Sequence, residues 1–221
     1  MVSSLAPKLR PPIPHEHGAW VVLYAPLLIT AVVLPTAAIW QTASLVGLIT
    51  AIFLARNCVS IVLRRKRGWE NAAAWLGVFT ALGLAAAWPL VAGPGGAALL
   101  MVGAIGATLF IVHNLLLLGP APKRLDRTRQ GQILAIAALC LNGPAQAAIA
   151  TGRLPWIAWV IWLSCMVFFG SSVFYVKMLL DAAKYRDQID LERCRLSRES
   201  NLYHGLMLVA AISLGAVVGG W

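Results

Sequence analysis

The stretch PHEHGAWVVLYAPLLITAVVLPT, residues 14–36, joins a dense polar cluster to a long apolar run. The cluster is His15-Glu16-His17, in a chain with only 4 histidines and 8 acidic residues. A helix needs about 20 apolar residues to cross a hydrocarbon core of roughly 30 Å, and the run at 17–36 has that length. We therefore expect this stretch to form the first membrane helix, with polar side chains at one end.

The rest of the chain repeats the apolar pattern. It is 60% hydrophobic and 12% charged, whereas soluble domains are near half apolar and about a quarter charged. A chain with so little charge cannot cover a surface in water. Apolar runs recur at residues 17–36, 39–57, 71–92, 96–118, 131–150, 155–180 and 202–221. They are continuous rather than alternating as in a barrel strand, so we predict an all-α bundle of about seven transmembrane helices. Residues 1–221 should form a single integral membrane domain.

The basic residues favour one orientation of this bundle. All but one of the 18 lysines and arginines lie in the N-terminal tail, in the segments after the second, fourth and sixth runs, or at the ends of the second and sixth runs (Arg56 and Lys177); the opposite connections carry only Arg153. Because cytoplasmic segments retain positive charge, we predict an N-in, C-out topology, with a cytoplasmic Pro-rich tail at 1–16 and a cytoplasmic charged loop at 181–201. The net charge of +10 then reflects topology and contact with anionic lipid, and no nucleic-acid partner is expected.

This topology gathers polar residues at the cytoplasmic membrane face. Ionisable residues just inside a membrane are costly, and they are functional candidates by default. We expect a ligand-binding pocket lined by His15, Glu16, His17, Arg56, Asn57, His113, Asn114, Tyr175, Lys177, Asp181 and His204.

Two further candidates, Asn142 and Gln146, lie deeper in the fifth run. They are four residues apart on one helical face, beside an Asn142-Gly143-Pro144 sequence that interrupts helical hydrogen bonding. Amides at membrane depth need partners or a cavity. The sequence leaves open an inter-helix clamp and the midplane site of a small-solute transporter.

The chemistry of the polar face is also open. Arg56, Lys177 and the histidines could bind an anionic molecule or a lipid headgroup, helped by helix N-termini. His15, His17, His113 and His204 could instead hold a transition metal or haem, although His15 and His17, two residues apart, do not share a helical face. A third alternative is that these side chains only anchor the helices. No HExxH, P-loop, dinucleotide or G-x-S-x-G motif occurs, so catalysis and cofactor remain undetermined.

The sequence Pro14-His15-Glu16-His17-Gly18-Ala19-Trp20, followed by an apolar helix containing Pro26, resembles the YwiC-like family of bacterial membrane proteins. Leu54-Ala55-Arg56, Tyr175-Val176-Lys177 and Tyr203-His204 resemble it as well. The resemblance implies a polytopic protein of the bacterial cytoplasmic (inner) membrane, and it implies no particular activity.

The layout, with polar groups at the cytoplasmic ends of helices, also looks like the UbiA-type prenyltransferases. Those enzymes bind magnesium diphosphate through two Asp-rich motifs. This chain lacks both motifs, and Asp181, Asp187 and Asp190 offer only a loose substitute. A prenyl or lipid transferase is therefore a further alternative.

Overall fold

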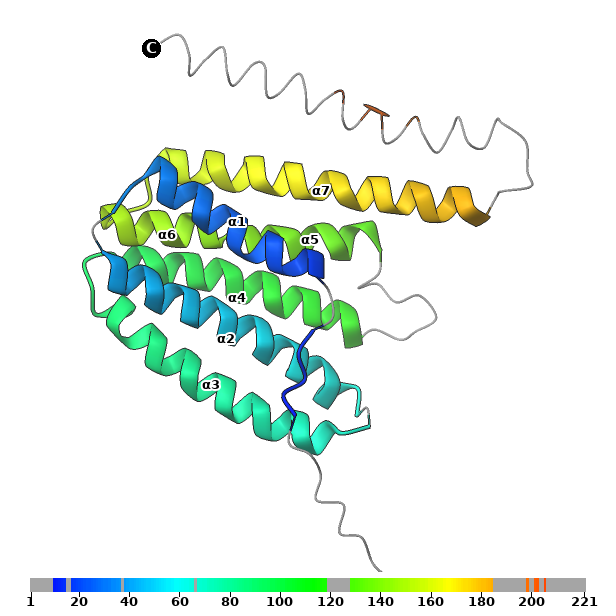
Figure 1. Ribbon diagram of the computed structural model, residues 1–221, viewed down its shortest axis with the longest axis horizontal. Coiled ribbons are helices and arrows are strands. Elements are labelled where there is room, and N and C mark those ends of the chain that lie inside the picture. The colour runs from blue at the N-terminus through cyan, green and yellow to red at the C-terminus, as the bar shows by residue number, and fades with distance from the viewer. Residues whose placement is uncertain are drawn as a thin grey trace, which may run out of the picture. The chain divides into compact units, whose positions relative to one another are not determined.

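The computed structural model describes residues 10–14, 17–36, 38–65, 67–118, 128–184, 198, 201–202 and 205. Every regular element in these ranges is a helix, which confirms the all-α prediction (Figure 1). The helices are α1 (His17–Val33), α2 (Ile39–Leu63), α3 (Trp69–Val91), α4 (Gly96–Leu118), α5 (Arg129–Cys140), α6 (Asn142–Thr151) and α7 (Trp156–Lys184).

Five helical segments are long and apolar enough to cross a membrane. They are Ile39–Leu63, Trp69–Val91, Gly96–His113, Gln130–Thr151 and Trp156–Val173. The apolar part of α1, Gly18–Val33, is shorter. The seventh predicted helix, 202–221, lies outside the described residues except for Leu202 and Gly205. In length and composition, these helices are those of a membrane protein.

Two predicted helix ends were wrong. The first run was expected to continue to residue 36, but α1 ends at Val33, because the backbone before Pro35 is biased away from the helical region. The second apolar run was predicted at residues 39–57, but α2 continues to Leu63. Its last turns are apolar: Ile61 and Val62 pack against a buried cluster that Cys58 forms with residues of α3.

The fifth apolar run is divided at Leu141 into α5 and α6, as the Asn-Gly-Pro sequence predicted. Pro144 has no N–H to donate to the carbonyl four residues before it, so the hydrogen-bond ladder is interrupted. This span is also the most enclosed of the five. Half of its most apolar 18 residues are buried, against 17–28% in the other four spans.

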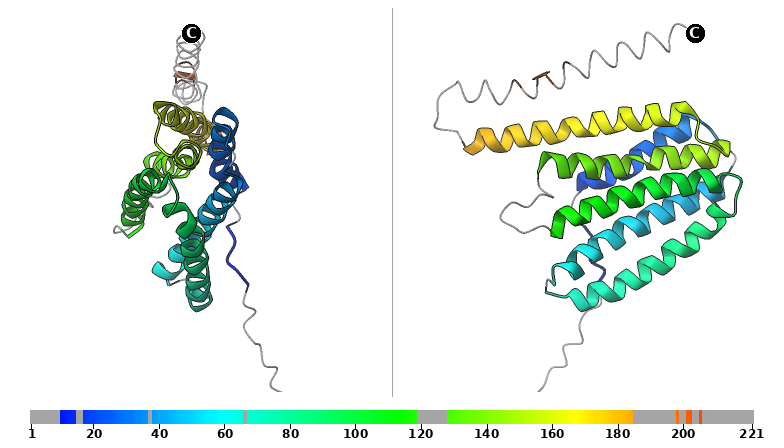
Figure 2. Two further views of the ribbon diagram at one scale, coloured as in Figure 1. Left: turned by 90° about the vertical axis from the view of Figure 1, so that its left-hand side faces the viewer. Right: turned by 180° about the vertical axis from the view of Figure 1, so that it is seen from behind.

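The chain divides into two units. The first comprises Met1–Gly103 and Asn142–Ala158, and the second comprises Ala104–Leu141 and the residues from Trp159 onward. Within the first unit, α2 and α3 lie side by side as an antiparallel hairpin (Figure 2), while α1 and α2 both contact α6. Within the second unit, Trp162 Nε1 on α7 donates a hydrogen bond to the Ala137 carbonyl on α5 (2.9 Å).

A short turn at residues 64–68 joins α2 to α3. Gly68 adopts a φ of +82°, in the left-handed region where a side chain is disfavoured, and α3 begins directly after it. The turn carries Arg64, Arg65 and Arg67, the last two exposed.

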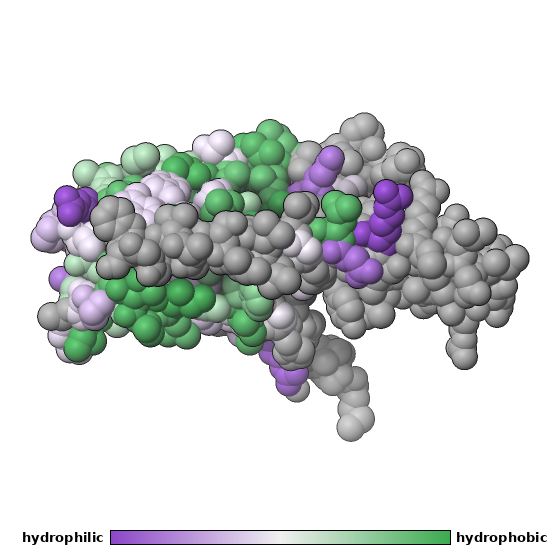
Figure 3. Space-filling view, turned by 90° about the horizontal axis from the view of Figure 1, so that it is seen from above, coloured by the Kyte–Doolittle hydropathy of each residue, from purple (hydrophilic) through white to green (hydrophobic). Residues whose placement is uncertain are grey.

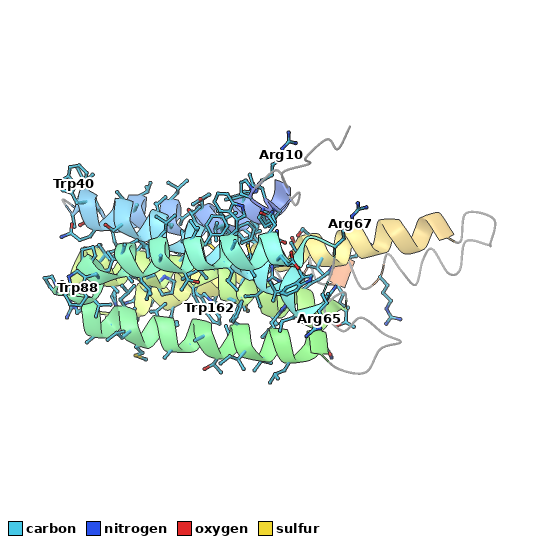
Figure 4. All side chains as sticks on the ribbon, turned by 90° about the horizontal axis from the view of Figure 1, so that it is seen from below. Arg10, Trp40, Arg65, Arg67, Trp88 and Trp162 are labelled. Atoms are coloured by element: carbon cyan, nitrogen blue, oxygen red, sulfur yellow. The ribbon has the colours of Figure 1, made fainter. Side chains whose placement is uncertain are left out.

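The first unit has two chemically distinct ends. Arg10, Arg65 and Arg67 lie at one end, which we call the arginine end, and Trp40 and Trp88 lie at the other, the tryptophan end (Figure 4). On the face that Figure 3 shows, hydrophobic residues cover much of the coloured surface, and strongly hydrophilic residues are few. This arrangement matches the interfaces and apolar band of a membrane protein.

Candidate functional site

The N-terminal strap, residues 10–14, is held at the arginine end by two asparagine side chains. Asn57 Nδ2 on α2 donates a hydrogen bond to the Pro12 carbonyl (2.6 Å). Asn71 Nδ2 on α3 donates to the Arg10 carbonyl (2.9 Å). Figure 1 shows the strap crossing the ends of these two helices. The chain immediately before His15 is therefore fixed against the α2–α3 hairpin.

The composition of the strap explains why amide donors hold it. Pro11, Pro12 and Pro14 have no backbone N–H, so this segment offers mainly carbonyl acceptors. The Ile13 N–H is already bonded to the Pro11 carbonyl (2.9 Å). A side-chain N–H from a neighbouring helix is the natural complement to such a segment.

Helix α1 is fixed to α2 just beyond the strap. The Trp20 ring meets Phe53 edge-on, with 4.9 Å between ring centroids. One turn later, the Tyr24 hydroxyl lies 2.7 Å from Thr50 Oγ1. Thr50 donates its own proton to the Val46 carbonyl (2.6 Å), so Tyr24 is the donor in the Tyr24–Thr50 bond. These contacts set where His17, the first residue of α1, stands relative to α2.

Two amides on α6 form a second polar arrangement, which we call the α6 clamp. Asn142 Nδ2 donates to the Leu23 carbonyl on α1 (2.9 Å), and Gln146 Nε2 donates to Thr42 Oγ1 on α2 (3.1 Å). Residues 143–148 are all buried. This packing favours the inter-helix clamp over a solute cavity as the role of the two amides.

The clamp leaves one acceptor unfilled. Gln146 is fully buried, at 0% exposure, and its Oε1 has no hydrogen-bond partner among the described residues. The clamp is also distant from the strap. Thr42 and Asn57 are 15 residues apart on α2, which corresponds to about 22 Å at 1.5 Å per residue. Gln146 and Asn57 therefore belong to different sites.

The structure describes only some of the residues that were predicted to line the ligand-binding pocket. Asn57 contacts the strap, and the preceding residue Arg56 is half-buried on α2. His113 lies on α4 in the second unit, where its side chain is 6% exposed. Outside the described residues lie His15, Glu16 and His204 entirely, and the side chains of His17, Asn114, Tyr175, Lys177 and Asp181.

The hypothesis of a metal or haem site depends on His15, His17, His113 and His204, and three of these four side chains lie outside the described residues. Among the side chains that the structure describes, no three histidine, cysteine, aspartate or glutamate residues come close enough to hold a metal ion. His113 is the one proposed ligand in that part of the chain.

Sequence reasoning missed five polar residues that fix the helices. A hydroxyl or amide inside an apolar run was the available signal, because such a group must find a partner in the bilayer. The partner could not be read from the sequence. These residues are Tyr24, Thr30, Thr42, Thr50 and Asn71.

Comparison with known proteins gives a family match. A family described as YwiC-like protein matches residues 13–147, more than half of the chain. A relative named "Uncharacterized protein YwiC", from Bacillus subtilis (strain 168), is 27% identical over 176 residues, which cover 79% of this chain and 69% of the relative. No solved structure matches. The family match begins within the strap and includes both amides of the α6 clamp.

Proposed function

The chain belongs to the YwiC-like family, and from this premise we propose that it binds an anionic or lipid-like small molecule in a polar pocket at its arginine end. In this proposal the protein is a single integral membrane domain of the bacterial cytoplasmic (inner) membrane, it crosses the bilayer about seven times with its N-terminus inside, and the arginine end faces the cytoplasm.

The hydrogen bond from Asn57 to the Pro12 carbonyl is the observation that carries the proposal. It is 2.6 Å long and joins residues 45 apart in the chain. Pro12 is three residues before His15, and Asn57 follows Arg56 on α2. The bond therefore fixes Pro12, shortly before His15, against the helix that carries Arg56, which supports a pocket lined by both stretches.

The charge of this end favours an anionic ligand. Arg64, Arg65 and Arg67 directly precede α3 in the chain, and Arg10 lies at the same end as Arg65 and Arg67 (Figure 4). Each basic residue near an anionic membrane surface contributes about 1 kcal/mol. α1 and α3 both begin here, and the N–H groups of helix N-termini attract anions. Glu70 in the first turn of α3 is acidic, and it is outnumbered by these cations.

Lipid titration in detergent tests the proposal, with bound lipid counted by native mass spectrometry. We expect the protein to retain phosphatidylglycerol, an anionic lipid, in preference to zwitterionic phosphatidylcholine. Arg56→Ala and His17→Ala should each weaken phosphatidylglycerol binding about ten-fold or more, because a hydrogen bond to a charged group contributes roughly 1.5–3 kcal/mol.

Arg153→Ala is the matched control, since this arginine is exposed in the connection that follows α6 and should not affect lipid retention. If Arg56→Ala and His17→Ala both bind as wild type does, the pocket is elsewhere. Metal analysis and an absorption spectrum of the same preparation address the alternative, because bound metal or a Soret band would favour a metal or haem site instead.

Transport is the second candidate function. The interruption at Leu141, at membrane depth, favours it. The complete burial of residues 143–148 opposes it, because a solute moving past α6 needs a cavity there. A solute-uptake signal in proteoliposomes that disappears in Gln146→Leu would give preference to transport.

A further inference from the structure

The start of α3 carries a buried donor and a buried acceptor that lack partners. Trp75 Nε1–H and Asn71 Oδ1 make no hydrogen bond to any residue that the structure describes. The two residues are four apart on α3, so their side chains lie on one face, about 5–6 Å apart at Cβ. Buried polar atoms without partners are few in native proteins, and each requires a physical explanation.

Because Trp75 Nε1–H is a donor and Asn71 Oδ1 is an acceptor, only some chemical groups can bond to both atoms. A phosphate or carboxylate oxygen can accept from Trp75, but it has no proton for Asn71 Oδ1. An ammonium group can donate to Asn71, but it cannot accept from Trp75. A hydroxyl group can do both, because it accepts through its oxygen and donates its proton. The site therefore fits one hydroxyl group.

The residues around Asn71 and Trp75 indicate that a ligand carrying this hydroxyl is amphiphilic. Trp75 packs against the apolar cluster of Cys58, Ala72 and Phe79, and its ring stacks on Phe79 with 5.5 Å between centroids. The Asn71 amide holds the strap through its Nδ2 atom, so its Oδ1 lies beside the strap. An apolar wall on one side and a polar main chain on the other suit a lipid headgroup with its acyl chains.

The neighbouring charge indicates an anionic headgroup. The turn at 64–68 precedes α3 and exposes Arg65 and Arg67, and both lie at the same end as Arg10 (Figure 4). A phosphate at this turn is complementary in charge. A hydroxyl carried a few bonds beyond the phosphate can then reach the first turns of α3.

We propose that Asn71 and Trp75 bind a headgroup hydroxyl of an anionic phospholipid of the phosphatidylglycerol class, with the phosphate at the basic turn of residues 64–68. This inference rests on the proposed function and specifies its ligand class. Trp75 Nε1–H donates to the hydroxyl oxygen, and the hydroxyl donates to Asn71 Oδ1. Asn71 and Trp75 are separate from Arg56 and His17, the residues that the test of the proposed function changes.

The test compares two anionic lipids, of which only one has hydroxyl groups in its headgroup. Phosphatidylglycerol and phosphatidylethanol have the same phosphate charge, and only the first has headgroup hydroxyls. Native mass spectrometry of the full chain in competition between the two should show about a ten-fold preference for phosphatidylglycerol, or ~1.4 kcal/mol. In Trp75→Phe, which keeps the ring and loses the N–H, the two lipids should bind equally.

Trp69→Phe is the matched control, because Trp69 is on the same helix and 43% exposed, and it should keep the wild-type preference. Asn71→Leu is a second variant that should also lose the preference if Trp75→Phe fails to fold. Equal binding of the two lipids by the wild type overturns the inference, as expected if an ordered water fills the site, while the pocket of the proposed function survives. Failure to bind either anionic lipid overturns both.

Discussion

At the scale of single residues, Gln146 is the least usual side chain in the described part of the chain. It is completely buried, its Nε2 is bonded to Thr42 Oγ1, and its Oε1 has no described partner. A buried acceptor without a donor costs about 1–3 kcal/mol, while a typical hydrogen bond contributes only about 1 kcal/mol. At the lower end of this range, the two contributions of this residue to stability nearly cancel.

Replacement of the α6 amides separates these contributions. Gln146→Leu should change the free energy of unfolding by no more than about 1 kcal/mol, because it removes the unfilled acceptor together with the Thr42 bond. Asn142→Leu, which removes only the bond to the Leu23 carbonyl, should lower stability by about 1 kcal/mol. Denaturant titration in detergent measures both. A loss above about 2 kcal/mol in Gln146→Leu would mean that Oε1 has a partner in solution.

At the scale of elements, the contact of α1 with α6 depends on a glycine. A Cβ atom at Gly143 would lie 3.1 Å from Thr30 Oγ1 and 3.4 Å from the Pro26 carbonyl oxygen. Thr30 is itself buried and bonded to that carbonyl (2.8 Å), so its hydroxyl has no room to withdraw. The absence of a side chain at residue 143 lets the two proline-containing helices approach.

Gly143→Ala should therefore lower the free energy of unfolding by about 1–3 kcal/mol, the usual cost of overpacking. The double variant Gly143→Ala/Thr30→Ala should recover part of this loss, because it removes the hydroxyl that the new methyl group meets. Gly77→Ala on α3 is the control, since a Cβ there meets nothing within 4 Å. Equal effects of Gly77→Ala and Gly143→Ala in thermal unfolding would contradict this account of the α1–α6 contact.

At the scale of the whole molecule, the first unit is polarised from its arginine end to its tryptophan end. The basic turn at 64–68 and Arg153 belong to connections on opposite sides of this polarity. Under the proposed topology, the first is cytoplasmic and the second faces outward.

Labelling of single cysteines in spheroplasts tests this orientation. In a background with Cys194→Ser, a membrane-impermeant maleimide should label Arg153→Cys from outside and should label Arg67→Cys only after the membrane is opened. Both positions are exposed, whereas Cys58, Cys140 and Cys165 are buried. Labelling of Arg67→Cys in intact spheroplasts would reverse the proposed topology.

Sequence reasoning predicted the helices well, because apolar runs and prolines act locally. The interruption beside Pro144 was predicted for that reason. The predicted end of the second run at residue 57 was wrong, because Arg56 and Asn57 interrupt the apolar pattern while the helix itself continues, with Asn57 donating to the Pro12 carbonyl. The strap, and the partners of the clamp that the sequence left open for Asn142 and Gln146, could not be predicted, since the acceptors include main-chain carbonyls, which every residue has. Asn71 was missed on the same grounds, whereas Tyr24 was missed because its partner, the Thr50 hydroxyl, belongs to another helix.

The long-range bonds of α1 have a consequence for how the protein is made. Leu23 is synthesised 119 residues before Asn142, and Arg10 is synthesised 61 residues before Asn71. The α2–α3 hairpin joins neighbouring segments, so it can assemble while the chain is still being translated. The shorter α1 acquires its α6 partner only after the fifth apolar span has left the ribosome. We therefore expect the contact of α1 with α6 to close later in biogenesis than the contacts of the strap and α1 with the α2–α3 hairpin.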